Sequence, residues 1–359
     1  MSSYLNLASG TPSNDLERIE TEQLFPIAIN DNSIQFVFPA NKGILEKHTT
    51  LILPVKAADA NTQLPLSCGI ASLCRSAELK ISGRTVAKQS DIGGVTAMNQ
   101  NFLPQEVRSR LELPRKGIYT AMEYNFSAAV KNAPVAGGAT PAGYSGGCPI
   151  GQTNYQLTNA DDTTARFYLR LEDLFPEVMG TSALQLPLMA IDGKVELVIY
   201  LNSQADRGIH TSAVGAAGNI TIVPNECLLL VDYLYYTPDA TQALMNRVMS
   251  KEGMVLNYSE MIVNKINLKA GATQPAVGQS SMERYNLNIG MTGRRVKQMY
   301  FRFEPTTKTD LFSKYCSEIG SRVALGEELQ IRVNNESLFP QPLREDGEKY
   351  FHLQEAKQM

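Results

Sequence analysis

The sequence has three histidines, the side chains best suited to metal binding or proton transfer. His48 precedes a predicted strand, His210 lies in a predicted loop after the sequence ADRGI, and His352 lies in the C-terminal tail. None belongs to a His-x-x-His or His-Glu pattern, the spacing at which one element supplies two metal ligands. No serine lies in a G-x-S-x-G motif, which would expose it as a nucleophile. We therefore expect surface or hairpin-end histidines without a catalytic or metal-binding role.

Adjacent carboxylates occur at Asp161-Asp162 and at Glu327-Glu328. Neighbouring residues of a strand point to opposite faces, so neither pair forms an acid and base by itself. The first pair lies in a predicted loop. We interpret it as part of a solvated loop, and the alternative is that it binds a cation. The glycines of GMTGRR and GAAGN lack the strand-to-helix context of a phosphate loop. The sequence therefore predicts no catalytic, cofactor-binding or metal-binding residues, no cofactor, and a protein that is not an enzyme.

The five cysteines form no C-x-x-C pair and no zinc set with a nearby histidine. We expect reduced and mostly buried thiols in a reducing compartment, with a Cys68–Cys74 disulfide as the alternative. The cysteines are Cys68, Cys74, Cys148, Cys227 and Cys316.

Charge and hydropathy also limit the function. Lys and Arg number 33 against 36 Asp and Glu, a net charge of −3, which gives no basis for direct sequence-specific binding of nucleic acid. The one short basic run, GRRVK at 293–297, is interpreted as a charged hairpin tip rather than a phosphate site. No apolar run is long enough for a transmembrane helix, and the N-terminus does not resemble a signal peptide.

Most of the chain shows the alternation of apolar and polar residues that predicts β-strands. The turn dipeptides Ser82-Gly83 and Asp192-Gly193 predict two hairpins between such strands. A Gly-, Ala- and Pro-rich stretch, residues 133–153, predicts a long surface loop. The predicted strands before residue 237 lie within 33–38, 48–57, 77–86, 166–175, 183–201, 219–223 and 226–236.

Two segments predict helices. Thr237 as N-cap, Pro238 at the first helical position and Asp239 in the first turn agree on a helix over 237–250. Residues 14–25 predict a short helix capped at Asn14 or Asp15, within a polar N-terminal arm. Strands resume after the central helix, in 257–270, 283–293, 294–305 and 332–343.

The strand pattern repeats at an offset of about 250 residues. Ile34 corresponds to Tyr285 and Ile81 to Ile331, so the Ser82-Gly83 turn corresponds to a turn at Asn334-Asn335. The first copy extends to Tyr236, whereas counterparts of its later strands are missing from the second. An incomplete sheet would expose strand edges, so we expect either a natural chain that continues beyond Met359 or a partner that completes the second unit.

The order of these segments resembles the double jelly-roll major capsid proteins of DNA viruses, particularly polinton-like viruses, adintoviruses and virophages. The likeness covers most of residues 20–359, and family members carry a complete second roll. The segments that carry it are NSIQFVFPANKGILEKHTTLILPVKA, RLEDLFPEVMGTSALQLPLMAIDGKVELVIYL, LLLVDYLYYTPDATQALMNRVMS and IRVNNESLFPQPLREDGEKYFH.

The resemblance implies an all-β fold of two tandem jelly-roll sandwiches joined by a short helix, with the second incomplete in this chain. The expected divisions are an N-terminal arm at 1–32, a first jelly roll at 33–236, a linker helix at 237–254 and the N-terminal part of a second roll at 255–359. Loops such as 130–160 would project from the outer end of the rolls, and the arm would contact neighbours at the base.

The resemblance also implies a function. It predicts a homotrimer that forms a pseudo-hexameric capsomer and tiles an icosahedral virus shell. Its partners would be neighbouring capsomers, penton and minor or cement capsid proteins and, in virions that have one, an internal membrane. The protein would reside in the virion capsid after assembly inside the host cell, in the cytoplasm or nucleus, without secretion by a signal peptide.

Two alternatives remain open at the level of sequence. A β-sandwich carbohydrate-binding or adhesin-type protein would need exposed aromatic residues on one face, and the chain has no Trp. Its Tyr233, Tyr235 and Tyr236 are better explained as a strand face packed against a neighbour. An enzyme of the cupin type would need a histidine pair at metal-ligand spacing, which the sequence lacks.

Overall fold

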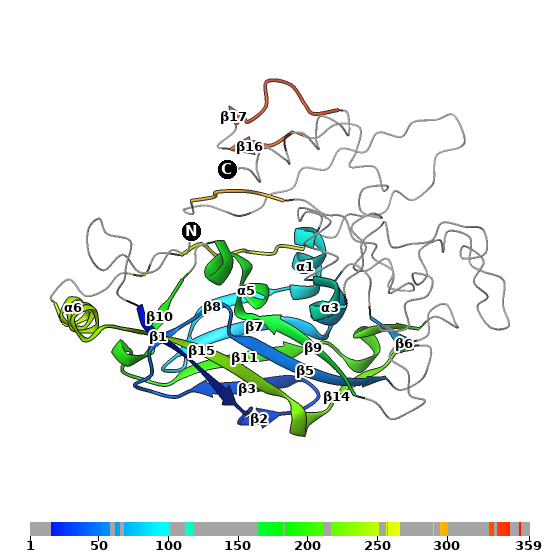
Figure 1. Cartoon of the computed structure of the whole chain (residues 1–359). Helices are drawn as coiled ribbons and strands as arrows, with labels where there is room; N and C mark the ends of the chain where they lie inside the picture. Colours follow the sequence, from blue (N-terminus) through cyan, green and yellow to red (C-terminus); the bar gives the residue numbers. More distant parts are fainter. Residues whose placement is uncertain are drawn as a thin grey trace, which may run out of the picture. The chain divides into compact units, whose positions relative to one another are not determined.

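The computed structural model of the chain describes residues 16–57, 62–64, 68–100, 112–117, 164–181, 184–210, 217–250, 256, 258–265, 290, 295–300, 330–333, 336–344 and 352. The chain divides into two compact units, Met1–Met261 with Thr309–Cys316 and Ile262–Lys308 with Ser317–Met359. Within the described ranges, all strands longer than three residues lie in the first unit (Figure 1).

Two β-sheets pack face to face in the first unit (Figure 1). In the first sheet, β15 lies between β1 and β5, and β9 pairs with the other edge of β5. In the second sheet the order is β2-β3-β11-β7-β8. The first sheet contains β1 (Leu16–Leu24), β4 (Ile44–Leu45), β5 (Thr50–Ala57), β9 (Ala165–Arg170), β10 (Leu186–Pro187), β14 (Ile220–Ile222) and β15 (Leu228–Tyr236), and the second β2 (Ala28–Ile29), β3 (Ser33–Phe38), β7 (Cys74–Ile81), β8 (Arg84–Ser90) and β11 (Val195–Leu201).

The strand order is that of a jelly roll. Numbered along the chain, the eight main strands are β1, β3, β5, β7, β8, β9, β11 and β15. The first sheet then has the order 1-8-3-6 and the second the order 2-7-4-5. Only the β7–β8 connection stays within one sheet, which is the double Greek-key arrangement of a jelly-roll sandwich. The described part of the first unit therefore has the expected all-β jelly-roll fold.

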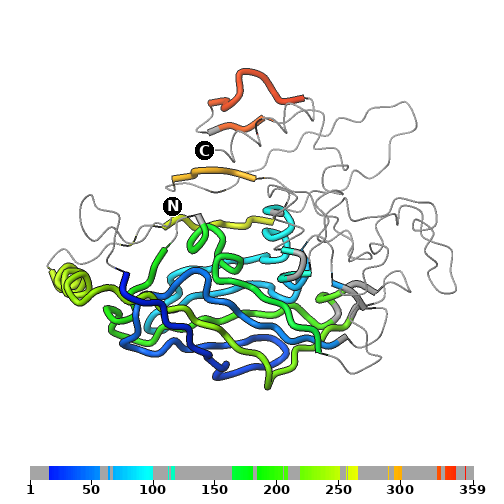
Figure 2. The backbone as a smooth tube through the Cα atoms, in the orientation of Figure 1, coloured from blue at the N-terminus to red at the C-terminus, as the bar shows by residue number. Residues whose placement is uncertain are grey.

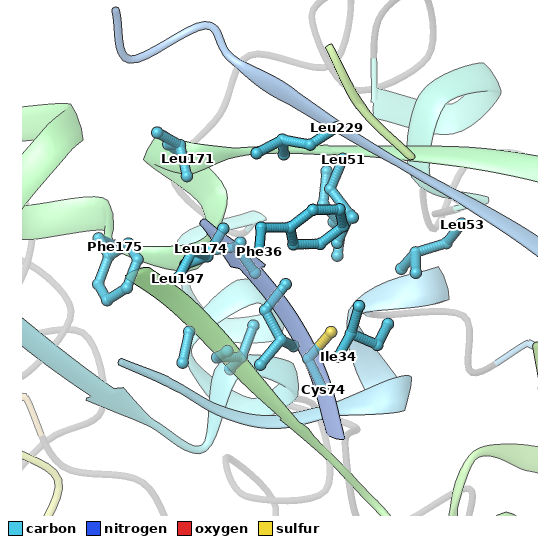
Figure 3. Packing of buried hydrophobic residues seen from close by; sticks show 14 of the residues in the cluster. Ile34, Phe36, Leu51, Leu53, Cys74, Leu171, Leu174, Phe175, Leu197 and Leu229 are labelled. Carbon is cyan, nitrogen blue, oxygen red and sulfur yellow. The ribbon is translucent and has the colours of Figure 1, made fainter. Parts of the chain in front are cut away.

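The core fills the space between the two sheets. Residues 34, 36 and 38 of β3 are buried while their neighbours are half-buried, as the alternating sequence predicts. Figure 3 shows Phe36, Leu51, Leu197 and Leu229 meeting there from strands of both sheets. Phe175, from the turn after β9, packs against the same cluster. The burial of these side chains is the main favourable term that holds the sheets together.

The N-terminal segment differs from the predicted arm and helix. Residues 16–24 form β1, which pairs antiparallel with β15 over its length, and β2 pairs with β3 (Figure 2). Glu, Gln and Leu favour a helix in isolation, but the paired backbone of β15 provides hydrogen bonds that override this weak preference. The expectation of an arm is therefore wrong for residues 16–29, which belong to the sandwich.

The two predicted hairpins had different outcomes. Ser82 (φ 49°) and Gly83 (φ 77°) form the two-residue turn between β7 and β8, as predicted. Asp192-Gly193 does not join paired strands, because β10 and β11 belong to different sheets. Both edges of β11 are already occupied by β3 and β7, so the preceding segment must cross to the other sheet.

The central helix α6 (Pro238–Val248) is confirmed, with Thr237 at the N-cap and Pro238 in the first turn. No side-chain hydrogen bond from Thr237 caps it. Its Ala240 and Leu244 form a small second cluster with Ile44, Leu234 and Tyr236. The helix thus covers one end of the outer side of the first sheet.

Further helical segments connect the strands, and the alternation pattern did not predict most of them. Gly93 and Gly94 weaken the helix propensity of α1 (Ile92–Gln100), yet burial of Ile92, Val95 and Ala97 stabilises it. The segment that follows β9 is helical, as α5 (Leu171–Leu174) and η5 (Pro176–Thr181). The other segments are η1 (Gly69–Leu73), α3 (Leu113–Lys116), α5 (Leu171–Leu174), η5 (Pro176–Thr181), η6 (Leu188–Ala190), η7 (Gln204–Asp206) and η8 (Pro224–Glu226), beside a small sheet of β6 (Thr62–Gln63), β12 (Gly208–His210) and β13 (Ala217–Gly218).

In the second unit, β16 (Arg332–Val333) pairs with β17 (Glu336–Ser337). Val333 lies opposite Glu336, so the connection has two residues, as the sequence predicts. Asn334 and Asn335 themselves, Tyr285 and the loop at 133–153 lie outside the described residues. The proposed duplication therefore stays a prediction.

Candidate functional site

His48 and His210 belong to the first unit and His352 belongs to the second. His48, just before β5, places its Nδ1 atom 3.5 Å from Glu172 Oε1 on the surface. His210 is the last residue of β12, where it pairs with Thr62 rather than lying in a loop. In the second unit, the His352 ring lies 5.1 Å from that of Phe339. Among the residues that the structure describes, no three His, Cys, Asp or Glu side chains gather as a metal site would need.

The described cysteines are Cys68, Cys74 and Cys227, and all three are completely buried. No disulfide joins Cys68 to Cys74, so the disulfide alternative is not realised. Burial raises the pKa of the Cys74 thiol, and likewise that of Cys227, to about 12. Both thiols therefore stay protonated at neutral pH and behave as small apolar core groups. Cys148, Cys316 and the paired carboxylates at 161–162 and 327–328 lie outside the described residues.

A buried cluster of four charges joins α3 to α5. Arg115 binds Asp173 through both terminal nitrogens and Glu112 at 2.7 Å, and Lys116 Nζ lies 2.5 Å from both carboxylates. The backbone N–H of Arg170 also donates to Asp173, at 2.7 Å. Two acids and two bases balance in charge, which a buried group of ions requires. These four ion-paired side chains hold α3 and α5 together, and they are named the clasp below.

The electrostatics of this clasp favour its ionised state. Burial alone would raise the pKa of Asp173, but the charges of Lys116 and Arg115 outweigh it and hold that pKa below its usual range. The pKa of Glu112 is lowered in the same way, against the effect of burial. Neither carboxyl group can therefore serve as a proton donor near neutral pH, as a general acid must.

Arg207 is a second buried charge, at the end of the sandwich where β3 begins and β11 ends. Its guanidinium donates to the carbonyl oxygens of Asn202 at 2.9 Å, Ile220 at 3.0 Å and Asp31 at 2.6 Å. Burial lowers the pKa of Arg207, although the charge of Asp31 opposes this shift. Because its donors are directed at three backbone segments, Arg207 fastens loops rather than binding a ligand.

The outer face of the second sheet carries charged side chains that range from the buried Glu78 to the exposed Lys88. Glu78 on β7 lies 2.8 Å from Lys88 and 3.2 Å from Lys80. Burial acts to raise the pKa of Glu78, but hydrogen bonds from the two lysines lower it overall. Glu196 on the neighbouring β11 pairs with Lys194 at 2.5 Å. This face is therefore a network of paired charges.

The described surface does not provide the aromatic platform of a carbohydrate-binding protein. Its exposed aromatic residues are Phe25, after β1, and Tyr258, whose hydroxyl donates to Val86 O of β8 at 2.5 Å. Tyr233 is buried in the main core between the two sheets, and Tyr236 is buried in the small cluster with α6. Of the basic run at 293–297, the described residues Arg295, Val296 and Lys297 are exposed. No helix in the described ranges is long and apolar enough to span a membrane.

Sequence reasoning missed both buried charge groups. The spacing of Glu112, Arg115 and Lys116 is that of ion pairs within one helical turn and could have indicated local pairing. Asp173 is separated from Arg115 by 58 residues, so no local pattern connects them. Arg207 follows an aspartate in the sequence, but its hydrogen-bond partners are backbone carbonyl oxygens. Every residue type has such a carbonyl, so the sequence does not reveal these partners.

Comparisons with known proteins found structural likeness only. No protein-family model and no curated protein matches the chain. It is similar to a quasi-atomic model of the PBCV-1 virus capsid (15% identity, TM-score 0.39, 66% of this chain and 46% of that one). It is also similar to the Sputnik virophage structure (11%, 0.40, 65% and 50%) and to the Faustovirus major capsid protein (10%, 0.39, 68% and 59%). The chain thus spans about half the length of these proteins, and such low identities and scores carry no functional assignment.

Proposed function

We propose that this chain is a major capsid protein, the structural subunit of an icosahedral virus shell. The observation that carries the proposal is the order of eight strands in the first unit, 1-8-3-6 facing 2-7-4-5. Jelly rolls of this order occur in viral capsids, lectins and cupins, so the fold alone does not select among them. The sequence resemblance supports a viral capsid protein. The described surface lacks the exposed aromatic platform that a carbohydrate-binding lectin would need, and the described residues lack the cluster of metal ligands that a cupin would need.

The role proposed is structural, and it assigns no catalytic residues or cofactor. Residues 255–359 would form the N-terminal part of a second roll, which the two-residue β16–β17 hairpin supports by matching the β7–β8 hairpin of the first. Three copies would form a pseudo-hexameric capsomer, in contact with neighbouring capsomers and with penton and minor or cement proteins in the virion. Closed cyclic trimers need a heterologous interface on each subunit.

Sedimentation of the purified chain at micromolar concentration tests the proposal. We expect a species of three times 39.4 kDa. Negative-stain images of that species should show a pseudo-hexagonal outline. A stable monomer over the whole concentration range would contradict the trimer, and binding to an oligosaccharide array without self-association would favour the lectin-like alternative instead.

A further inference from the structure

Strand β1 is the last strand at one end of the first sheet in the described part of the chain. It pairs with β15 along its length, and β15 meets β4 and β5 on its other side (Figure 1). The second edge of β1 has backbone N–H and C=O groups with which another strand can pair. With nine residues, this edge is long enough to add a strand from another molecule.

Side chains on both sides of β1 are exposed beside this edge. Ile19 is 57% exposed although it is a large apolar residue, and the side chains of Arg18 and Glu20 are 64% and 40% exposed. Ile19 lies opposite Leu234, on the side of the sheet that α6 covers. Arg18 and Glu20 point to the other side, because successive residues of a strand alternate. A strand that pairs with β1 therefore meets an apolar group on one side and two opposite charges on the other.

The sequence of β1 is complementary to itself in one antiparallel register. When two copies of a strand pair about a twofold axis, the residue at the axis lies opposite its own copy. With Ile19 at the axis, Arg18 of each copy lies opposite Glu20 of the other, and Glu17 lies opposite Thr21. This register forms two ion pairs on one side of the sheet and brings two exposed apolar side chains together on the other.

The other central registers place like charges opposite each other, which destabilises a strand pair. An axis at any charged residue sets that residue against its own copy, and an axis at Thr21 sets Glu20 against Glu22. Charges on an edge strand usually prevent edge-to-edge pairing, and those of β1 do so in every central register except the one at Ile19. The charged residues of the strand are Glu17, Arg18, Glu20 and Glu22.

The register at Ile19 also continues an apolar cluster of the chain. Leu234, opposite Ile19, is buried with Ile44 beneath α6. Ile19 extends this cluster to the edge of the sheet, where its own side chain stays exposed. Pairing Ile19 with its copy joins the two clusters across the axis and removes both side chains from water. Charge pairing and apolar contact thus favour the same register.

We propose that β1 pairs antiparallel with β1 of a second copy of this chain, about a twofold axis at Ile19. The first sheets of the two copies then form one continuous sheet. The inference goes beyond the proposed function, because a twofold contact cannot close a trimer and would instead connect two capsomers. A contact between two nine-residue strands is smaller than a standard interface, so we expect it at higher protein concentration than the trimer.

A matched pair of cysteine variants tests this register. In Ile19→Cys the two introduced thiols face each other at the axis, within the Cα separation that a disulfide spans. In Gln23→Cys, on the same side of the same strand, the register places the two thiols about 27 Å apart along the strands. With the thiol oxidant diamide we expect Ile19→Cys to give a reducible product of twice 39.4 kDa, and Gln23→Cys to give no more of it than the wild type.

Two results of this experiment overturn the inference. One is equal crosslinking of the two variants, or none from Ile19→Cys. The other is an Ile19→Cys thiol that a maleimide cannot reach in dilute solution, since the rest of the chain would then cover the edge. A trimer that forms without the crosslink contradicts this inference alone, whereas a crosslinked dimer from a chain that never forms a trimer contradicts the proposed function alone.

Charge reversal in the Ile19→Cys background gives a second measurement. Arg18→Glu sets two like-charge pairs across the contact, so we expect the rate of crosslinking to fall about tenfold, and Glu20→Arg should have the same effect. The double variant restores opposite charges, and its rate should return toward that of Ile19→Cys alone. Lys42 keeps Glu22 as a partner at 3.0 Å in each variant. A double variant as slow as the single variants overturns the inference, because Arg18 and Glu20 would then not meet across the contact.

Discussion

At the scale of single residues, Gly43 lies where the backbone of β15 passes too closely for any side chain. A Cβ atom at this position would lie 2.3 Å from the carbonyl oxygen of Leu234. Because this oxygen belongs to the backbone, it cannot rotate away as a flexible side chain could. We expect Gly43→Ala to lower the free energy of unfolding by about 1–3 kcal/mol, measured by urea denaturation.

Gly180 is the matched control for Gly43. A Cβ atom there would meet nothing closer than 3.9 Å, and its backbone conformation is ordinary. Gly180→Ala should therefore leave the urea midpoint nearly unchanged. Equal midpoints for the two variants would mean that β15 shifts freely away from residue 43, against the close approach seen in the structure.

Single residues also show what a local pattern can predict. The turn at Ser82-Gly83 follows from the two residues themselves, because glycine adopts the positive φ that a tight hairpin requires. Asp192-Gly193 carries the same signal, yet its turn leads to the other sheet. Gly193 instead lies against Ser82, whose N–H donates to Lys194 O at 2.8 Å. A dipeptide predicts a turn, but it does not indicate which strands the turn will join.

At the scale of elements, the buried charges of Glu112, Arg115, Lys116 and Asp173 fasten α3 to α5. Asp173→Asn would leave two buried cations with one carboxylate, so we expect a loss of about 3 kcal/mol at pH 7 in the free energy of unfolding. The folded pKa of Asp173 is lowered, so its stabilisation is complete above the unfolded value of about 3.9 and is lost as the pH falls through the folded value. The difference between variant and wild type should therefore shrink below about pH 4.

The control for this prediction is an exposed ion pair. Glu226→Gln breaks the pair with Arg166 on the surface, where water and salt screen the attraction between the charges. Urea denaturation at pH values from 2 to 7 gives the free energy of unfolding at each pH. The difference between Glu226→Gln and the wild type should stay nearly constant over this range. A difference between Asp173→Asn and the wild type that stays constant down to pH 2 would show that the carboxylate charge is not what stabilises the clasp.

Elements also differ in how far the sequence predicts them. The start of α6 depends on Thr237, Pro238 and Asp239, which act within one turn, and the helix is confirmed. The strand β1 depends on β15, which pairs with it from more than 200 residues away, as the bond between Thr21 and Asp232 illustrates. Residues whose conformation is set by a distant partner follow that partner rather than their own propensity.

At the scale of the whole molecule, the pattern of alternation predicted a sandwich, and spacing alone suggested that it occurs twice. It could not predict that the outer faces of the two sheets differ, because that requires the register. Leu228, Ile52 and Tyr168 are single apolar residues in three separate strands, and only pairing brings them into one row. This arrangement on one face was therefore hidden from the sequence, although strands β5, β9 and β15 that build it were predicted.

The part of the first unit that ends at Met261 should fold on its own. Among the described residues, every buried residue of the main cluster lies between Ile34 and Tyr233, and the last one packed against it is Leu256. We expect a fragment of residues 1–261 to unfold cooperatively in urea, because it keeps both sheets and α6. A fragment of residues 1–236 should be less stable, since Ile44, Leu234 and Tyr236 would lose the cover of Ala240 and Leu244. If the longer fragment unfolds gradually, or binds a hydrophobic dye as a loosely packed state does, the first roll depends on the chain beyond it.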